Sequence, residues 1–392
     1  MFDLDKARKL MENRELDGLI VSSPENFYYV SDYVGMTGTV GTATAIIPKS
    51  QDQDAVVIVL DWEIEEAREQ TWIKDVRTFE TWIYFEKDGV TLPLAKSKPE
   101  QFDPFQVVSD VLAEKSIDEG KLGVELNVIP VTYFEKLRKA IPKANLVNAN
   151  DLFWEMRSVK SPDEVSIIKE AARIHEKGIR AAVKVAKEGV TEKEIANEFR
   201  KVVIGDRRYC WGIVAIFVGG GANSGSPHHT FMTPSNYVLR RGDFLKFDGS
   251  INFKGYITGI ARTYVIGEPS KKQEKLYNAL LQAQRKIVES MKPGVKPSDL
   301  YKIGIKTVRE SGFQQYIRGH LGHSISLGPL AQEPPFISAT EKGELVPGML
   351  FCIEVPYYIL GLGGVNIEDM IVVTPDGHEE LTTLSRELSL SS

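Results

Sequence analysis

The chain has 392 residues, enough for two or three domains of about 150 residues each. Its 42% hydrophobic and 26% charged residues are typical of a globular protein, which excludes a disordered or fibrous chain. A net charge of −6 and the lack of a basic run indicate that nucleic acid is not a partner. No apolar run approaches the roughly 18 residues of a membrane span, and the N-terminus carries acids rather than signal-peptide bases. We therefore expect a cytoplasmic protein that does not bind a membrane.

The two cysteines, Cys210 and Cys352, lie far apart in the sequence and form no CxxC cluster. This spacing argues against a disulfide framework and against a structural zinc site made of thiolates. A reduced compartment is the better expectation.

Residues 1–155 are predicted to form a smaller α/β domain. The β-branched runs at 18–21 and 54–60 and the apolar run at 122–125 are typical of buried strands, and a helix is expected over 132–140. This half of the chain offers neither a metal-ligand cluster nor a glycine-rich phosphate loop.

Residues 156–392 are predicted to form a second domain whose helices begin at capping boxes. Such boxes occur at 161–164, 191–194 and 270–273. The order of patterns then recurs at an offset of about 105 residues, because 242–248 resembles 348–354. This recurrence predicts a duplicated helix-helix-sheet unit. We expect Asp248 and Glu354 to face each other at the centre of the duplicated pair.

Three carboxylates and a histidine are the candidate functional residues of the second domain. Asp248, Glu354 and Glu368 lie in apolar strand patterns, where a charged side chain needs a partner or a metal ion. His323 lies in a similarly apolar setting. Oxygen and imidazole ligands together suit Mn²⁺, Fe²⁺, Co²⁺ or Zn²⁺. A protonated or hydrogen-bonded carboxylate cluster without metal is the alternative.

A series of short motifs follows in a fixed order: Pro227-His228, Gly255-Tyr256 with Ala261-Arg262-Thr263, Gly322-His323, Pro347-Gly348-Met349 with Ile353-Glu354, and Ile367-Glu368-Asp369-Met370. In this order they resemble the pita-bread metallopeptidases, which include prolidase, aminopeptidase P, methionine aminopeptidase and creatinase. The resemblance implies an α+β fold. A pita-bread catalytic domain with internal duplication would cover 156–392, preceded by a creatinase/prolidase-like N-terminal domain over 1–155.

The resemblance also implies a set of metal ligands. Asp248, His323, Glu354 and Glu368 match four of the family's five ligand positions, and the fifth, normally an aspartate that bridges two ions, is Gly259. We therefore expect one divalent ion (Mn, Co, Fe or Zn) rather than two, and expect Gly259→Asp to raise the number of ions bound. A metal-free site is the alternative.

Catalytic and substrate-binding roles are implied in the same way. His228 and Glu354 correspond to proton-transfer residues, and Arg262 and His320 are candidates for substrate binding. A second active-site histidine that the family carries about seven residues after His323 is missing between Leu330 and Gln332.

The resemblance favours a hydrolase of the Xaa-Pro peptidase type, acting on a dipeptide with a single-metal site. The first alternative is a metal-free hydrolase of a small non-peptide C–N bond, like creatinase or ectoine hydrolase. The second is a non-catalytic binding protein. Relatives with this layout are homodimers, so we expect a homodimer in which the aromatic stretch 80–86, with Trp82, reaches a neighbouring substrate pocket.

Overall fold

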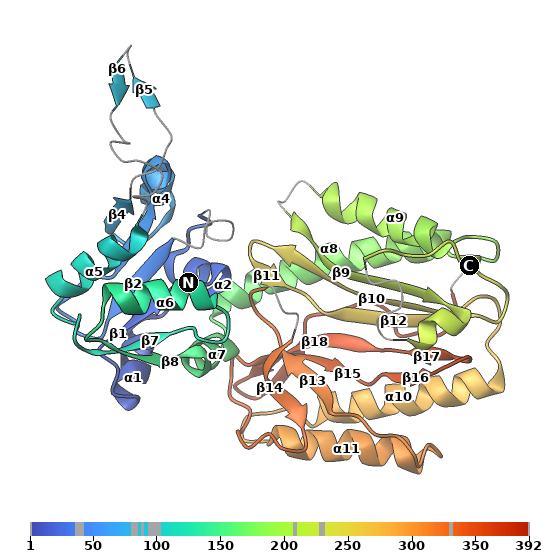
Figure 1. Ribbon diagram of the computed structural model, residues 1–392. Coiled ribbons are helices and arrows are strands. Elements are labelled where there is room, and N and C mark those ends of the chain that lie inside the picture. The colour runs from blue at the N-terminus through green and yellow to red at the C-terminus, as the bar shows by residue number, and fades with distance from the viewer. Residues whose placement is uncertain are drawn as a thin grey trace. The chain divides into compact units, whose positions relative to one another are not determined.

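The computed structural model describes residues 2–35, 43–79, 85–87, 90–92, 103–206, 210–226, 232–328 and 332–390. The chain divides into two compact units, 1–156 and 157–392 (Figure 1). Both contain helices and sheets, which confirms the predicted α+β class with two domains. Trp82 and His228 lie outside the described residues.

The first unit is built on a six-stranded mixed sheet in the order β4-β3-β2-β1-β7-β8. Its central strands are short, apolar and buried along their whole length, as expected for a sheet covered on both faces. The strands are β1 (Gly18–Val21), β2 (Thr44–Pro48), β3 (Val56–Leu60), β4 (Asp75–Phe79), β7 (Lys121–Val124) and β8 (Asn145–Asn148), and β5 (Phe85–Lys87) pairs separately with β6 (Val90–Leu92). The helices are α1 (Leu4–Asn13), α2 (Pro24–Ser31), α4 (Ile64–Gln70), α5 (Pro104–Glu114), α6 (Val131–Ala140) and α7 (Asn150–Ser158).

The second unit contains one large sheet whose main path runs β11-β10-β12-β18-β15-β13-β14, with β9 beside β10 and β19 beside β18. A separate hairpin pairs β16 (Tyr357–Ile359) with β17 (Gly363–Val365). The strands of the large sheet are β9 (Cys210–Gly220), β10 (Phe244–Phe253), β11 (Tyr256–Ile257), β12 (Ile260–Val265), β13 (His320–Ser324), β14 (Glu333–Ser338), β15 (Leu350–Glu354), β18 (Glu368–Thr374) and β19 (Gly377–Glu380).

Two helix pairs cover this sheet, and each pair belongs to one copy of the duplicated pattern. Helices α8 (Pro162–Val185) and α9 (Glu192–Ile204) pack on the half that contains β9 and β10, and α10 (Lys271–Glu289) and α11 (Pro297–Glu310) pack on the half that contains β13–β15 (Figure 1). Ser161, Thr191 and Ser270 each form the predicted capping box at a helix start. The internal duplication is therefore present in the fold.

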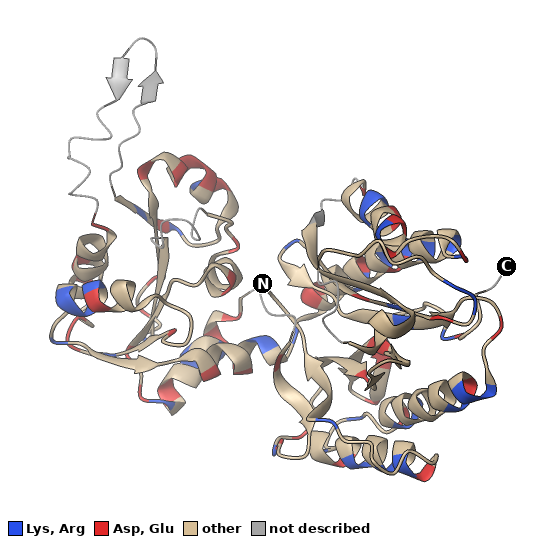
Figure 2. Cartoon of the chain, turned by 45° about the vertical axis from the view of Figure 1, so that its right-hand side comes forward, with Lys and Arg blue, Asp and Glu red and all other residues tan. Residues whose placement is uncertain are grey.

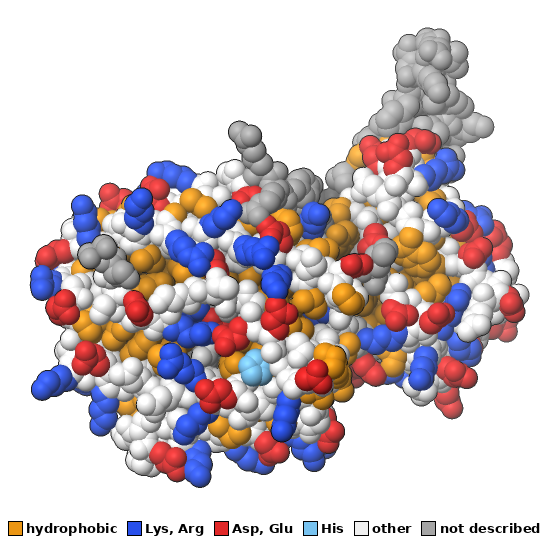
Figure 3. Space-filling model, turned by 180° about the vertical axis from the view of Figure 1, so that it is seen from behind, with side chains coloured by type: hydrophobic (Ala, Val, Ile, Leu, Met, Phe, Trp, Pro, Cys, Tyr) orange, Lys and Arg blue, Asp and Glu red, His pale blue; other side chains and the backbone are white. Residues whose placement is uncertain are grey.

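Charged side chains concentrate on the outer helices. In Figure 2 the helices carry blue and red segments, while the strands of the sheets are mostly tan. On the face that Figure 3 shows, basic and acidic side chains are interspersed over the second unit. Among the described residues, the helices are too short or too polar to span a bilayer.

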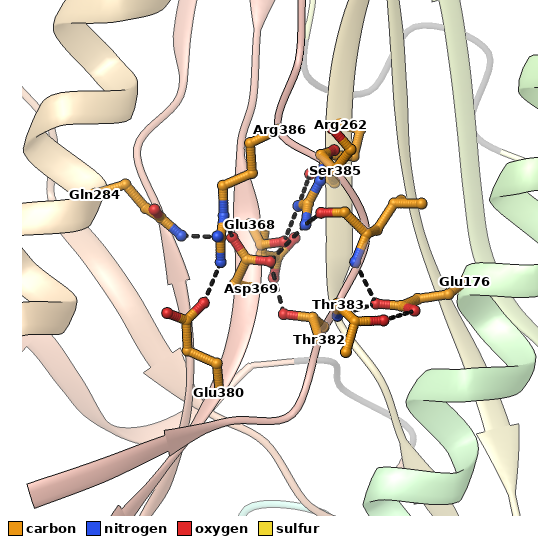
Figure 4. A network of polar contacts seen from close by, with 12 residues as sticks. Glu176, Arg262, Gln284, Glu368, Asp369, Glu380, Thr382, Thr383, Ser385 and Arg386 are labelled. Atoms are coloured by element: carbon orange, nitrogen blue, oxygen red, sulfur yellow. Dashed lines mark hydrogen bonds and ion pairs between the residues drawn. The ribbon is translucent and has the colours of Figure 1, made fainter. Parts of the chain in front are cut away.

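Neighbouring residues of β18 point to opposite faces of the sheet. Asp369 points towards α10, where its Oδ2 accepts a hydrogen bond from Nε2 of Gln284 at 2.6 Å (Figure 4). Its Oδ1 pairs with Nη2 of Arg262 at 2.6 Å, and both side chains are fully buried. Burial raises the pKa of Asp369, but the charges of Arg262 and Arg386 outweigh it and lower the pKa. Because side chains alternate along a strand, Glu368 faces the other side, away from the helices.

His175 is buried at the interface between α8 and the sheet. Its Nδ1 lies 2.8 Å from Oγ1 of Thr258, its ring contacts Phe199 edge-on, and its Nε2 has no hydrogen-bond partner among the described residues. Burial, assisted by the charge of Arg262, lowers the pKa of His175 to about 3. Since the ordinary value is 6.5, the unfolded chain binds a proton at mild acidity that the folded chain excludes.

We predict that His175 makes the protein acid-sensitive. The contribution of His175 to the free energy of unfolding is complete above pH 6.5 and is lost as the pH falls towards 3. The loss is about 1.4 kcal/mol per pH unit, which amounts to roughly 2–3 kcal/mol at pH 4.5. His175→Gln keeps a hydrogen-bonding amide and should flatten this part of the curve, measured by denaturant unfolding between pH 4.5 and 7. His378→Gln, at a partly exposed histidine, is the control. Parallel curves for wild type and His175→Gln would contradict the prediction.

Candidate functional site

The predicted carboxylates meet on one face of the large sheet. Cross-strand pairs connect Asp248 to Ala261, Ala261 to Glu368, and Glu368 to Glu354, so that one row crosses β10, β12, β18 and β15. Directly paired residues project to the same face of a sheet. The duplicated pattern therefore brings Asp248 and Glu354 into one row, with Glu368 between them.

Glu354 is held by a cation that the chain itself supplies. Its Oε1 accepts a hydrogen bond from Nη2 of Arg318 at 3.0 Å, and Nδ1 of His320 lies 3.6 Å from the same oxygen. The guanidinium of Arg318 also lies 5.9 Å from the centre of the Tyr358 ring. Burial lowers the pKa of His320, although the charge of Glu354 opposes this shift.

Asp248 has its own polar neighbours at the other end of the row. Its Oδ2 accepts a hydrogen bond from Nδ2 of Asn366 at 3.0 Å. Lys246, two residues earlier on β10, places its Nζ 4.7 Å from the centre of the Tyr358 ring. Desolvation by the surrounding protein raises the pKa of Asp248, and the charge of Lys246 opposes that rise.

His323, Cys352 and Glu368 form a second cluster beside the row. One donor atom from each of these buried side chains lies within 4.8 Å of the other two. Nε2 of His323 is 3.6 Å from Oε1 of Glu368, and Nδ1 of His323 donates to the carbonyl oxygen of Ser324 at 2.9 Å. Burial lowers the pKa of His323, but the interactions with Glu368, Glu354 and the Ser324 carbonyl together outweigh burial and raise the pKa overall.

Gly259 lies directly against this cluster. A Cβ added at Gly259 would be 2.6 Å from Oε1 of Glu368 and 2.7 Å from Sγ of Cys352. The Cys352 thiol also donates to the carbonyl oxygen of Gly259 at 3.7 Å. The space that an aspartate side chain would need is thus occupied by a thiol and a carboxylate.

Arg262 is brought to the opposite face from these residues. Its five N–H groups donate to oxygen atoms of Ala261, Glu368, Asp369, Leu384 and Ser385, and its side chain is fully buried (Figure 4). A guanidinium has five donors, so none remains for a substrate. The geometry supports a structural role for Arg262 in place of the expected substrate contact.

Three residues of the site were missed by the sequence analysis: Lys246, Arg318 and Cys352. A signal for two of them was present, because Lys246 and Cys352 each lie two positions before a predicted carboxylate on the same strand. Residues i and i+2 of a strand share a face. Arg318 lies in the loop before β13 and carries no such periodic signal.

Comparison with known protein families gives a match for each of the two units of the chain. Residues 166–375 match metallopeptidase family M24, and residues 4–159 match the creatinase/prolidase N-terminal domain. The chain belongs to metallopeptidase family M24. The prediction of a pita-bread hydrolase acting on C–N bonds is therefore confirmed.

Relatives of known name match along nearly the full length. The Xaa-Pro dipeptidase of Pyrococcus horikoshii is 28% identical and is covered over 98% of both chains. The crystal structure of a prolidase from the same organism superposes with a TM-score of 0.81 over 98% of this chain and 99% of that chain, at 28% identity. An Xaa-Pro dipeptidase structure from Bacillus anthracis gives a TM-score of 0.83 over 98% of each chain, at 26% identity.

Membership of this family implies use of a divalent metal ion, and the row and the cluster beside it contain side chains that can bind one. His323 and Glu368 face each other with donor atoms 3.6 Å apart. Gly259, which the motif resemblance matches to the family's bridging aspartate, has no donor side chain. Glu354 and Asp248 are already bonded to Arg318 and Asn366. The described side chains around Gly259 thus offer His323, Glu368 and Cys352 as possible ligand donors.

We predict that Gly259→Ala destabilises the protein through Cys352. The new methyl group would overlap the thiol, and overpacking of this kind costs about 1–3 kcal/mol. Cys352→Ala removes the overlap with the thiol, while the contact with Glu368 remains, so a double-mutant cycle measured by denaturant unfolding should show a favourable coupling of at least about 0.5 kcal/mol. Gly343→Ala, where an added Cβ meets nothing within 4 Å, is the control. Additive effects of the two substitutions would contradict the prediction.

The close contact of Gly259 with Cys352 and Glu368 also bears on the predicted effect of Gly259→Asp on metal binding. A carboxylate introduced by Gly259→Asp would meet Cys352 and Glu368 before it could reach a metal ion. Gly259→Asp should therefore raise the number of bound ions only when it is combined with Cys352→Ala.

Proposed function

We propose that the protein is a hydrolase of Xaa-Pro dipeptides that operates with a single divalent ion. The observation that carries the proposal is the row Asp248–Glu368–Glu354 with His323 beside it, on the face of an M24 sheet that lies away from the helices. Two relatives from Pyrococcus species that match over 98% of this chain are Xaa-Pro dipeptidases, which supports the same substrate class.

In this proposal some residues bind the ion and others transfer protons to or from the substrate and water. His323 and Glu368 would hold the ion, with Glu354 and Asp248 next to it. A divalent ion in such a site polarises the scissile carbonyl and acidifies water. Glu354 would accept the proton of the attacking water, and His228 would transfer a proton to the departing nitrogen.

Arg318 and His320 are proposed to orient the dipeptide. Nε of Arg318 is buried without a hydrogen-bond partner among the described residues, while Nη2 of the same guanidinium holds Glu354. A guanidinium with a spare donor suits the C-terminal carboxylate of a dipeptide. His320 is partly exposed beside Glu354, where it can contact the substrate in place of the family's missing histidine.

Hydrolysis of Xaa-Pro dipeptides, measured with and without added divalent metal, tests the function. A kcat/KM for Xaa-Pro substrates well above that for Xaa-Ala dipeptides supports the proposal. Turnover of creatine-like substrates and not of dipeptides would support the alternative of a non-peptide C–N hydrolase. The homodimer, the contact from Trp82 and the cytoplasmic location remain predictions.

We predict that Glu354→Gln lowers kcat by about 100-fold or more. The amide keeps the size of the side chain but cannot accept the proton of water. A loss of rate of about 100-fold is the usual magnitude for the removal of a general base. Steady-state kinetics on an Xaa-Pro dipeptide measures the effect, with Glu344→Gln, an exposed glutamate, as the control. A variant with near wild-type kcat would remove Glu354 from the proton-transfer step.

A further inference from the structure

Cys352 occupies the place that the missing aspartate leaves empty. It lies on β15 two residues before Glu354, and β15 pairs with β13 so that Cys352 is directly opposite His323. Paired residues project to the same face, which brings the thiol and the imidazole together. From the other side, the thiol lies 2.7 Å from the point where a Cβ of residue 259 would be. The absent carboxylate and the present thiol therefore compete for one position.

The imidazole of His323 is prepared as a ligand. The carbonyl oxygen of Ser324 can only accept, so the 2.9 Å contact fixes the proton on Nδ1 and leaves the lone pair on Nε2. Metal-binding histidines commonly donate their second ring N–H to a carbonyl in this way. Ser324 is itself positioned, because its Oγ accepts from Nζ of the buried Lys160 at 2.9 Å.

The separation of the donor atoms of His323 and Glu368 suits a single tetrahedral ion. Donors that bind Zn²⁺ at about 2.0–2.3 Å are roughly 3.3–3.6 Å apart at tetrahedral angles. Nε2 of His323 and Oε1 of Glu368 are 3.6 Å apart, slightly too far for a hydrogen bond. Sγ of Cys352 completes a triangle in which every separation is within 4.8 Å.

We propose that Cys352 is a metal ligand and that His323, Cys352 and Glu368 together bind one thiophilic divalent ion such as Zn²⁺ or Co²⁺. A sulfur ligand replaces the family's bridging carboxylate and shifts the preference away from Mn²⁺. Three protein ligands leave one position for water or substrate, as in catalytic zinc sites. Glu354, paired with Arg318, is left outside the ligand set to act as a base. The inference rests on the proposed function only in placing an ion at this site.

Co²⁺ binding to the full-length chain tests the ligand set without an activity measurement. Wild-type protein should bind one Co²⁺ per chain with sulfur-to-metal charge-transfer absorption in the near ultraviolet. Cys352→Ala should lose that absorption and bind Zn²⁺ at least about tenfold more weakly, the minimum expected when a supporting group is removed from a metal site. Cys210→Ser, at the chain's second cysteine, should keep both properties. Cys352→Ser retains a side chain of similar size in case the alanine variant folds poorly.

The outcomes separate the ligand assignment from the proposed function. Unchanged Zn²⁺ affinity in both Cys352 variants, or Co²⁺ bound without charge-transfer absorption, would overturn the role of Cys352, whether or not Xaa-Pro dipeptides are hydrolysed. Charge-transfer absorption that disappears only in the Cys352 variants supports the ligand set even if no dipeptide is cleaved. In that case the peptidase proposal alone fails. Wild-type protein that binds neither Zn²⁺ nor Co²⁺ overturns the metal site as a whole.

Discussion

Carboxylates that share one face of a buried sheet repel one another unless cationic groups lie among them. Asp248, Glu368 and Glu354 form such a row. Lys246 lies near one end of it, and Arg318 is bonded to Glu354 at the other end. A buried charge without a partner is far less stable than a paired one. Lys246 and Arg318 therefore offset part of the negative charge of the row.

The strand β18 couples this site to the stability of the fold. Glu368 contributes to the row, while the next residue, Asp369, anchors the opposite face through Arg262, Gln284 and Arg386. Because these bonds are buried and mutually supporting, they fix the position and rotation of β18. The carboxylate of Glu368 is thereby placed by a network on the other side of the sheet (Figure 4). This arrangement explains why a fully satisfied arginine follows directly after the row residue Ala261.

The features that depend on local sequence patterns or on the internal duplication could be predicted from the sequence. Capping residues such as Ser161 and Thr191 marked helix starts, and the repeat predicted that Asp248 and Glu354 converge. The contact of Arg318 with Glu354 could not be predicted, because a loop side chain acquires its partner only from tertiary packing. Arg262 was predicted to contact substrate, yet strand alternation turns it towards the helices. The sequence distance between Cys352 and Cys210 argues only against a disulfide or a thiolate zinc site, whereas the pairing of Cys352 with His323 arises from the sheet register.

The exchange of an aspartate for a glycine has a different meaning once the neighbouring thiol is taken into account. A site that had only lost its bridging carboxylate would leave a polar cavity, whereas here the thiol of Cys352 and the carboxylate of Glu368 fill the space around Gly259. Glycine is then required by the volume of its neighbours, because even a methyl group would overlap the sulfur atom. With Cys352 as the proposed ligand, a softer, unshared sulfur would take the place of a hard, shared oxygen, and such a site would suit a single thiophilic ion better than a pair of ions.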